Sequence, residues 1–554
     1  MTAIRVMGAE TEYGIHVPGA PGLNATWLSS QVVHSYAMFA AQHAAGGAET
    51  RWDYTDENPL ADARGWALPR DQAHPSQLTD DPAAAAPSGE SWAGPGGRPD
   101  VLTAAGIALS DWDSADGALD TADRVDAPPM VMNMVLGNGA RLYVDHAHPE
   151  YSSPEVTNPE DAVTWDFAGD EVARRILADL AERRANGEPE LPEIQLYKNN
   201  TDSKAASYGS HENYLMPRQL PFGQIVSGLT PFFITRQLIC GAGRVGLGQD
   251  AAVPGFQLSQ RADFFEAEVG LETTIRRPII NTRDEPHSVA DKYRRLHVII
   301  GDANLSQVSH YLKFGSTALV LDLIERGLAP QLEVWEPVEA LQAVSHDVSG
   351  QNKYRLIDGR RVTALDIQWM YFEAAQRAAE QRPDRHTAGV LQRWADVLTG
   401  LATGYREVSG KVEWAAKLAL LEQYRERDGL AWDDPRLALI DLQWADVRLD
   451  KGLANRLQAR GRLDTVVSAA RIESAVLRPP EDTRAYFRGE CIRRFGASVV
   501  GASWDSVIFE RPAQRRLQKV PTREPLRGTK ALTGELFEAH ADLEDFLQSL
   551  LGGI

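Results

Sequence analysis

Residues 141–151 read Arg141-Leu142-Tyr143-Val144-Asp145-His146-Ala147-His148-Pro149-Glu150-Tyr151. The first five alternate between polar and apolar side chains, which is the pattern of a half-buried β-strand. Because successive side chains on a strand point to opposite faces, Arg141, Tyr143 and Asp145 share one face. Leu142 and Val144 lie on the other. The stretch therefore predicts a sheet with an apolar core on one side and reactive groups on the other.

The N-terminal stretch Ile4-Arg5-Val6-Met7-Gly8-Ala9-Glu10-Thr11-Glu12-Tyr13-Gly14 repeats this arrangement. Glu10 and Glu12 fall on one side of an extended strand, roughly 6.5–7 Å apart. Magnesium ions prefer oxygen ligands, and Glu10, Glu12 and Glu150 suit that task. A solvated strand face is the alternative interpretation of any one such strand. Two acid-rich strands side by side would instead form a pocket of carboxylates.

The remaining pattern predicts a mixture of strands and long helices without regular alternation. A hairpin is expected from residues 131–136 and 141–145, because Asn138-Gly139 suits a tight turn. Further strands are expected at 194–199, 212–216, 256–260, 279–283 and 297–300, and helices at 28–46, 158–187, 231–240, 316–326, 364–381 and 391–401. This order favours an α+β fold with an antiparallel sheet.

Two features suggest the domain organisation. Residues from about 51 to 129 are rich in Asp, Ala, Pro and Gly, which predicts a long mobile insertion. Pro479-Pro480 predicts a boundary between a catalytic domain at 1–478 and a small C-terminal domain at 479–554.

The composition is that of a soluble globular protein, with 43% hydrophobic and 24% charged residues. No apolar stretch approaches the roughly 20 residues of a membrane helix, and the N-terminus has no signal-peptide pattern. We therefore expect a cytoplasmic protein that is not bound to a membrane. The formal net charge of −20 argues against broad nucleic-acid binding. Two cysteines exclude a disulfide framework.

Two motifs suggest other chemistry. His146 and His148 could aim two imidazoles at zinc, but no H-E-x-x-H sequence or nearby cysteine completes the ligand set. Gly241-Ala242-Gly243-Arg244-Val245-Gly246 fits the dinucleotide-binding fingerprint, yet Pro254-Gly255 soon follows, which is a poor start for a helix. We interpret it as a glycine-rich loop. There is no P-loop motif and no nucleophile elbow.

Basic residues concentrate between residues 276 and 295, where Arg277 and Arg283 are candidates to bind substrate or phosphate. Salt bridges to Asp284 and Glu285 are the alternative interpretation. His211 lies in a second polar stretch, 210–214, of the kind that lines a pocket.

Taken together, several motifs resemble the Pup ligase and depupylase family, whose members are relatives of glutamine synthetase. The resemblance covers nearly the whole chain outside the insertion and rests on Gly8–Gly14, Asn138–Asp145, His148–Tyr151, Lys198–Asp202 and Asn281–His287. The insertion resembles a loop of the depupylase members that the ligases lack, through Arg51–Tyr54 and Asp62–Trp66. The present insertion is longer than expected for that loop.

The resemblance implies a glutamine-synthetase-like antiparallel sheet cradle packed with helices, with ATP (or ADP with phosphate) and Mg²⁺ as cofactors. By position in the motifs, Glu10, Tyr143 and Glu150 resemble metal-site residues, and Asp145 resembles the catalytic carboxylate. Arg141, Ser153 and Trp504 resemble nucleotide contacts. Ser153 stands where the ligases have threonine.

The implied function is that of a depupylase and Pup deamidase. Such an enzyme cuts the isopeptide bond between the C-terminal glutamate of Pup and a substrate lysine, and also deamidates a C-terminal glutamine of Pup. Its partners would be Pup, pupylated proteins and, as a further expectation, the bacterial proteasome. The alternatives are a Pup-protein ligase and a catalytically idle Pup-binding adaptor.

Overall fold

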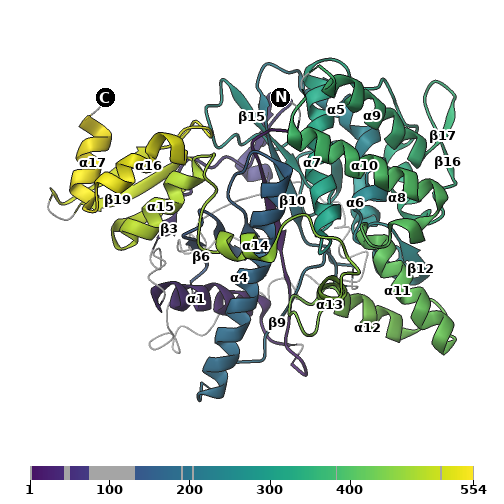
Figure 1. The fold of residues 1–554 in the computed structure, drawn as a ribbon, viewed down its shortest axis with the longest axis horizontal. Helices are drawn as coiled ribbons and strands as arrows, with labels where there is room; N and C mark the ends of the chain where they lie inside the picture. Colours follow the sequence, from purple (N-terminus) through teal and green to yellow (C-terminus); the bar gives the residue numbers. More distant parts are fainter. Residues whose placement is uncertain are drawn as a thin grey trace.

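A six-stranded antiparallel sheet runs through the centre of the computed structural model (Figure 1). The model describes residues 3–20, 22–42, 50–73, 131–188, 191–202, 205–381, 383–511 and 514–552. The strand order in the sheet is β15(Tyr293–Val298), β10(Ser210–Pro217), β1(Met7–Glu12), β8(His148–Ser152), β7(Arg141–Asp145) and β6(Asn133–Val135). Every neighbouring pair is antiparallel, so the α+β expectation is confirmed.

Helices cover the apolar face of this sheet. Helix α4(Pro159–Ala185) begins where Asn158 accepts a hydrogen bond from the Asp161 backbone, and Pro159 occupies the first turn, where its missing N–H costs nothing. Thr11 of β1 donates to Asp166 of this helix at 2.9 Å. Helix α7(Gln307–Glu325), almost entirely buried, packs beside α4. The helices therefore hold β1 from behind and leave Glu10 and Glu12 on the opposite face.

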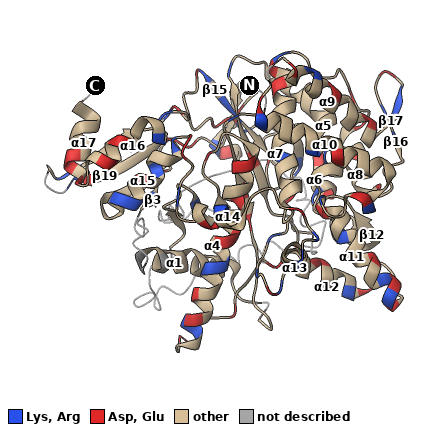
Figure 2. Ribbon diagram, viewed as in Figure 1, with Lys and Arg blue, Asp and Glu red and all other residues tan. Residues whose placement is uncertain are grey.

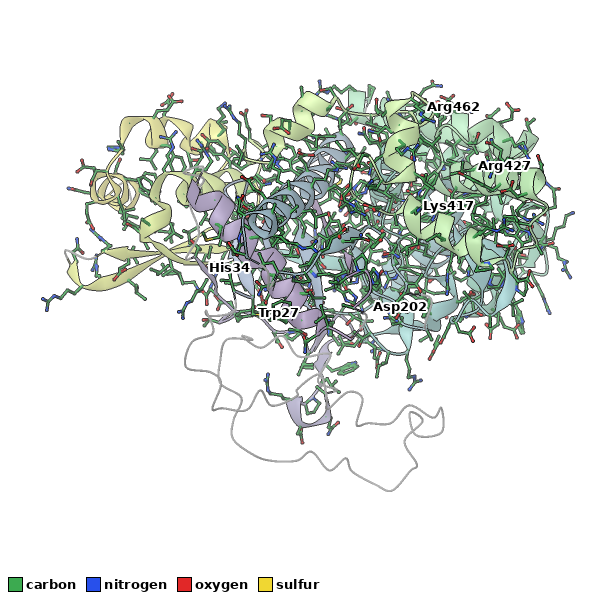
Figure 3. The ribbon with its side chains drawn as sticks, turned by 90° about the horizontal axis from the view of Figure 1, so that it is seen from below. Trp27, His34, Asp202, Lys417, Arg427 and Arg462 are labelled. Carbon is green, nitrogen blue, oxygen red and sulfur yellow. The ribbon has the colours of Figure 1, made fainter. Side chains whose placement is uncertain are left out.

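Two large apolar clusters lie behind the sheet. One joins α5(Phe222–Thr235), α7, α9(Ala364–Ala379) and α10(Arg385–Thr403). The other joins α1(Ala25–Gln42) to the β7–β8 hairpin, where Leu142 and Tyr151 are buried. In Figure 3, α1, marked by Trp27 and His34, lies between the yellow C-terminal elements and the green helices around Lys417.

The other elements are shorter or peripheral. The helices are α6(Gln237–Cys240), α8(Pro337–His346), α11(Glu413–Asp428), α12(Pro435–Trp444), α13(Leu453–Ala459), α14(Ala469–Ala475), α15(Ala485–Phe495), α16(Lys530–Ala539) and α17(Leu543–Gly552), with short 3-10 turns at Arg70–Gln72, Ala262–Phe264, Tyr405–Val408 and Gly496–Ser498. The strands are β2(Gly14–His16), β3(Arg51–Trp52), β4(Ala61–Asp62), β5(Trp66–Ala67), β9(Gln195–Tyr197), β11(Arg244–Leu247), β12(Val253–Gln257), β13(Phe265–Gly270), β14(Arg277–Asn281), β16(Lys353–Arg355), β17(Arg361–Thr363), β18(Val499–Ala502), β19(Ser506–Arg511) and β20(Arg516–Pro521).

The C-terminal elements build a second sheet, in the order β20-β19-β18-β3, with its own aromatic core. Phe537 and Phe546 stack at 4.9 Å in that core. The domain boundary expected at Pro479-Pro480 stays a prediction.

Residues 51–73, at the start of the expected insertion, make defined contacts with the rest of the protein. Strand β3 pairs in parallel with β18, and the Trp52 side chain is buried in the C-terminal aromatic core. Asp62 accepts a hydrogen bond from Thr282 at 2.6 Å. The composition averaged over the whole insertion does not reveal these few residues that make specific contacts. Residues 74–130 lie outside the described part of the chain.

Several element boundaries differ from the sequence expectation, and two of them matter for the site. Helix α5 begins nine residues before Pro231, which lies inside it. Strand β15 begins at Tyr293 and not at residue 297. The glycine-rich stretch 241–246 follows helix α6 and enters strand β11, which is the reverse of the dinucleotide motif. The stretch is therefore not a nucleotide-binding turn, but only residues 241–243 form a loop, because 244–246 belong to β11.

Charged side chains of both signs are interspersed over the ribbon, with basic residues marked on β15 (Figure 2). Within the described residues, no helix is both long enough and apolar enough to cross a membrane.

Candidate active site

The register of the central sheet brings distant polar residues into one row. Glu12 of β1 lies opposite Glu150 of β8, and Glu150 lies opposite Tyr143 of β7. The Tyr143 hydroxyl donates to Glu150 at 2.6 Å. Three residues that the sequence predicted at a metal site are therefore neighbours on one face.

Asp145 joins this row to form an acidic cluster, which we define as Glu12, Asp145 and Glu150. One carboxylate oxygen from each lies within 4.8 Å of the others. Burial, together with the charges of Asp145, Glu10 and Glu12, raises the pKa of Glu150 well above its ordinary value. Crowded carboxylates of this kind are stabilised by a divalent cation, so the donor set fits Mg²⁺.

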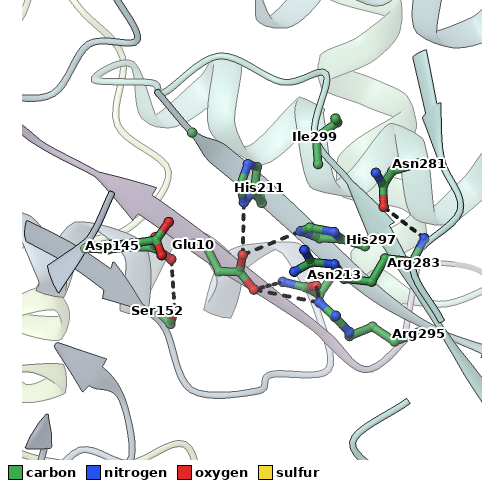
Figure 4. A network of polar contacts seen from close by, with 12 residues as sticks. Glu10, Asp145, Ser152, His211, Asn213, Asn281, Arg283, Arg295, His297 and Ile299 are labelled. Atoms are coloured by element: carbon green, nitrogen blue, oxygen red, sulfur yellow. Dashed lines mark hydrogen bonds and ion pairs between the residues drawn. The ribbon is translucent and has the colours of Figure 1, made fainter. Parts of the chain in front are cut away.

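Glu10 lies beside the acidic cluster but has different partners (Figure 4). Its carboxylate is 3.1 Å from Nδ1 of His211 and 3.7 Å from Nε2 of His297. Asn213 donates to it at 2.8 Å, and an Arg295 nitrogen is 3.9 Å away. These five residues are called the Glu10 group below.

Burial and hydrogen bonding have opposing effects on the pKa values in the Glu10 group. Burial alone would raise the pKa of Glu10, but the hydrogen bonds with His211 and His297 outweigh it and hold the pKa well below its usual value. Burial lowers the pKa of His297 to about 3, so its imidazole is neutral near pH 7. Glu10, His211 and His297 form the second set of side chains, among the described residues, that could hold a metal ion.

Asp145 ends strand β7 and lies at the rim of the acidic cluster. Burial raises its pKa, but the charge and hydrogen bond of His146 outweigh this and lower the pKa overall. The carboxylate is therefore ionised near neutral pH. An ionised carboxylate can accept a proton from water or attack a carbonyl.

The two histidines that were weighed as zinc ligands have different partners. His146 lies in the turn after β7 and contacts Asp145, whereas His148 stacks on Tyr208 at 4.4 Å. Neither belongs to a group of three metal-binding side chains in the described part of the chain.

A cleft opens next to Glu10 and holds about 560 Å³ of empty space, part of it open to solvent. Ser153 and Trp504, two of the expected nucleotide contacts, both line it. The Ser153 hydroxyl accepts a hydrogen bond from the Ala9 backbone at 2.9 Å. Trp504 packs edge-on against Trp52 at 5.0 Å.

Glu155 and Arg484 line this cleft, and Arg488 contacts Glu155. Glu155 accepts hydrogen bonds from Arg484 and Arg488. Burial would raise the pKa of Glu155, but the charges of Arg488 and Arg484 lower it to about 2. Arg484 also donates to backbone carbonyls of His287 and Thr522, so it ties the loops at the edge of the cleft together.

Arg141, the third expected nucleotide contact, lies between two aromatic rings. Its guanidinium is 3.8 Å from the Tyr143 ring centroid and 4.2 Å from that of Trp52. It donates to Asn133 and to the Tyr54 hydroxyl, each at 3.1 Å. The ordered start of the insertion therefore fixes the orientation of Arg141.

Arg277 and Arg283 lie at different places. Arg277 donates a hydrogen bond to the Ser207 carbonyl at 2.6 Å. Burial lowers the pKa of Arg277, and the nearby charge of Glu12 opposes this shift. Arg283 lies on the other side, near Arg295 and His297 (Figure 4), and its buried Nε has no hydrogen-bond partner among the described residues. The basic segment 276–295 therefore contributes Arg277 near Glu12 and Arg283 near the Glu10 group.

Sequence reasoning missed three residues of the site. Arg295 and His297 alternate on β15 and belong to the Glu10 group, but the expected strand began only at residue 297. Arg261 is buried beside Ser207, and burial, with the charge of Arg277, lowers its pKa to about 9. The sequence signal that could have identified Arg261 is its position directly after Ser259-Gln260, at the end of an expected strand.

With this geometry established, the chain can be compared with known proteins. The family model described as "Pup-ligase protein" matches residues 5–508. The chain belongs to this Pup-ligase family. Residues outside that match include the helices α16 and α17.

Two curated relatives cover 99% of this chain and 99% of their own length. The depupylase of Acidothermus cellulolyticus is 52% identical over 554 residues. The Pup deamidase/depupylase of Mycolicibacterium smegmatis is 48% identical over 548 residues.

Two solved structures share the fold. A complex of the prokaryotic ubiquitin-like protein Pup with its ligase PafA has a TM-score of 0.73 and 30% identity, covering 99% of this chain and 95% of that one. The Pup ligase PafA in complex with ADP has a TM-score of 0.67 and 33% identity, covering 83% and 97%. The expected glutamine-synthetase-like fold is confirmed by these matches.

Proposed function

We propose that the chain is a depupylase and Pup deamidase. It hydrolyses the isopeptide bond between the C-terminal glutamate of Pup and a substrate lysine, and it deamidates a C-terminal glutamine of Pup. Both reactions attack the same γ-carbonyl, so one site serves both. The proposal is supported by the acidic cluster beside the cleft and by full-length relatives that carry these two names.

Asp145 is the proposed catalytic residue. An amide resists water because its carbonyl is a poor electrophile, so the site needs an activated nucleophile and a partner for the developing oxyanion. The ionised Asp145 carboxylate provides the first, either as a general base to water or as the nucleophile itself. Arg277 and Arg283 are the proposed partners of substrate oxygens. His211 contacts Glu10 and lines the same site.

Mg²⁺ would be held between Glu12 and Glu150, with Tyr143 and Glu10 beside them, and bound there it would supply positive charge beside the substrate carbonyl. Tyr143 keeps the Glu150 carboxylate in place through the hydrogen bond that its hydroxyl donates. The cleft lined by Ser153 and Trp504 suits ATP, or ADP with phosphate, with Arg141 at its edge. The neighbour crystallised with ADP supports this assignment.

The proposal places the enzyme in the cytoplasm with Pup and pupylated proteins as partners. An association with the bacterial proteasome stays a prediction.

The proposed function is tested with purified protein, Pup ending in glutamine and one pupylated protein. Each substrate is incubated with Mg²⁺ and ATP, and the products are identified by intact-mass spectrometry. Deamidated Pup and a released, unmodified target protein are the expected products. A parallel reaction containing Pup ending in glutamate and a free target protein tests the ligase alternative. Conjugate formation without hydrolysis would favour a ligase, and binding of Pup without any reaction would favour an adaptor.

A further inference from the structure

The turn that joins β7 to β8 has a backbone that its residues disfavour. Asp145 pairs with His148, so only His146 and Ala147 form the loop. Both have positive φ, 42° for His146 and 71° for Ala147. Two-residue hairpin loops with positive φ at both positions strongly favour Asn-Gly, because a Cβ atom is unfavourable there. The sequence His146-Ala147 therefore carries conformational strain.

Contacts with two described residues help to hold this strained turn. The Ala147 carbonyl accepts a hydrogen bond from Ser29 of α1 at 2.8 Å. His146 Nδ1 lies 2.7 Å from the Oδ2 atom of Asp145. A carboxylate oxygen only accepts, so Nδ1 is the nitrogen that carries the proton. The positive φ directs the imidazole of one residue back onto the carboxylate of the residue before it.

Stability alone does not explain this pair. The side chains of His146 and Asp145 are 40% and 30% exposed, and ion pairs with that much solvent contact add little stability. Asn-Gly would form the same turn without strain. Backbone strain that persists next to reactive groups is a feature of functional sites.

We propose that His146 is a positioning residue that orients the Asp145 carboxylate for the reaction. The hydrogen bond to Oδ2 fixes the rotation of the carboxylate, and so sets the direction of its second oxygen toward the substrate carbonyl or the attacking water. The strained turn is what makes this contact between adjacent residues reachable. The inference rests on the proposed function of Asp145.

Two substitutions separate orientation from folding. His146→Gly removes the imidazole and also relieves the backbone strain, so the turn folds at least as well. His146→Asn keeps a side-chain N–H at the position of Nδ1, and asparagine tolerates positive φ. The kcat and KM for Pup deamidation, the ADP affinity and the Tm are measured for both variants and for the unsubstituted protein.

We expect His146→Gly to lower kcat at least about tenfold, as loss of one aligned hydrogen bond to a charged group does, while KM, ADP affinity and Tm stay near their original values. His146→Asn is expected to recover most of the lost kcat. Undiminished kcat in His146→Gly would overturn the inference, as would an equal loss in His146→Asn. An unsubstituted protein that hydrolyses neither substrate contradicts the proposed function instead, so the two failures are distinguishable.

Discussion

Glu12 and Glu150 lie directly opposite each other on the antiparallel strands β1 and β8, although 137 positions separate them in the sequence. The Cα register brings both carboxylates to the same face, where Asp145 approaches them. Such a concentration of negative charge is costly in a buried site unless a cation or protons balance it. The same register is the basis of the first prediction.

Glu150→Gln is expected to fold normally and to lose most of the stabilisation that Mg²⁺ gives. The substitution removes one charge from the acidic cluster but keeps its size and its contact with Tyr143. The rise in Tm on adding Mg²⁺ measures this directly. Glu373→Gln, at a helix position whose side chain is 60% exposed, is the control and should respond to Mg²⁺ as the original protein does.

Arg141→Lys is expected to weaken ADP binding about tenfold, because lysine keeps the charge but not the planar stacking and the forked hydrogen bonds. Arg141 is placed by Trp52, Tyr143 and Tyr54. Isothermal titration with ADP provides the measurement. Arg427→Lys, on helix α11 (Figure 3) and outside the lining of the cleft, removes a stack on Tyr424 at 4.7 Å and should leave ADP binding unchanged. Equal affinities in both variants would remove Arg141 from the nucleotide site.

Lys198→Met is expected to destabilise the fold by about 3–5 kcal/mol, since it leaves buried carboxylates without their cation. The Lys198 amino group lies 2.7 Å from Asp166 and 2.9 Å from Asp170, all with side chains at most 1% exposed. Urea unfolding measures the change. Lys353→Met, at an exposed strand position, is the control. A loss below about 1 kcal/mol would show that the pair is not a structural anchor.

The stability contributed by Glu155 is expected to depend on pH. Its pKa is lowered from 4.5 to about 2 in the folded protein, so its contribution is complete above pH 4.5 and disappears as the pH falls toward 2. Glu155→Gln should therefore cost roughly 1–3 kcal/mol of unfolding free energy at pH 7 and progressively less below pH 4.5. Chemical unfolding at several pH values provides the test. A difference that stays constant from pH 7 to pH 3 would contradict the assignment.

The sequence predicted the central strands because their polar and apolar residues alternate. Arg141–Asp145 and Met7–Glu12 were expected as half-buried strands, and both form as expected. The convergence of Glu10, Glu12, Tyr143, Asp145 and Glu150 followed from the face that each side chain occupies. A period of two fixes the face, so the site could be inferred once the strands were known to be neighbours.

Other features depend on long-range packing and were not predictable in this way. His297 and Arg295 reach Glu10 only because β15 pairs with β10 and β10 pairs with β1. Lys198 belongs to one of the motifs of the family resemblance, but its side chain lies behind the sheet among carboxylates of α4. Trp52 is ordered because the C-terminal core receives it, which the local composition does not reveal.

The account depends most on Asp145, and one comparison tests it directly. Asp145→Asn keeps the size of the side chain and its place at the end of β7, but removes the charge that would activate water or attack the carbonyl. Deamidation of Pup and cleavage of a pupylated protein are followed in parallel, with ADP affinity as the measure of an intact site. The account predicts that both hydrolyses are lost together while ADP binds as before. Retention of either hydrolysis at the original rate would contradict it.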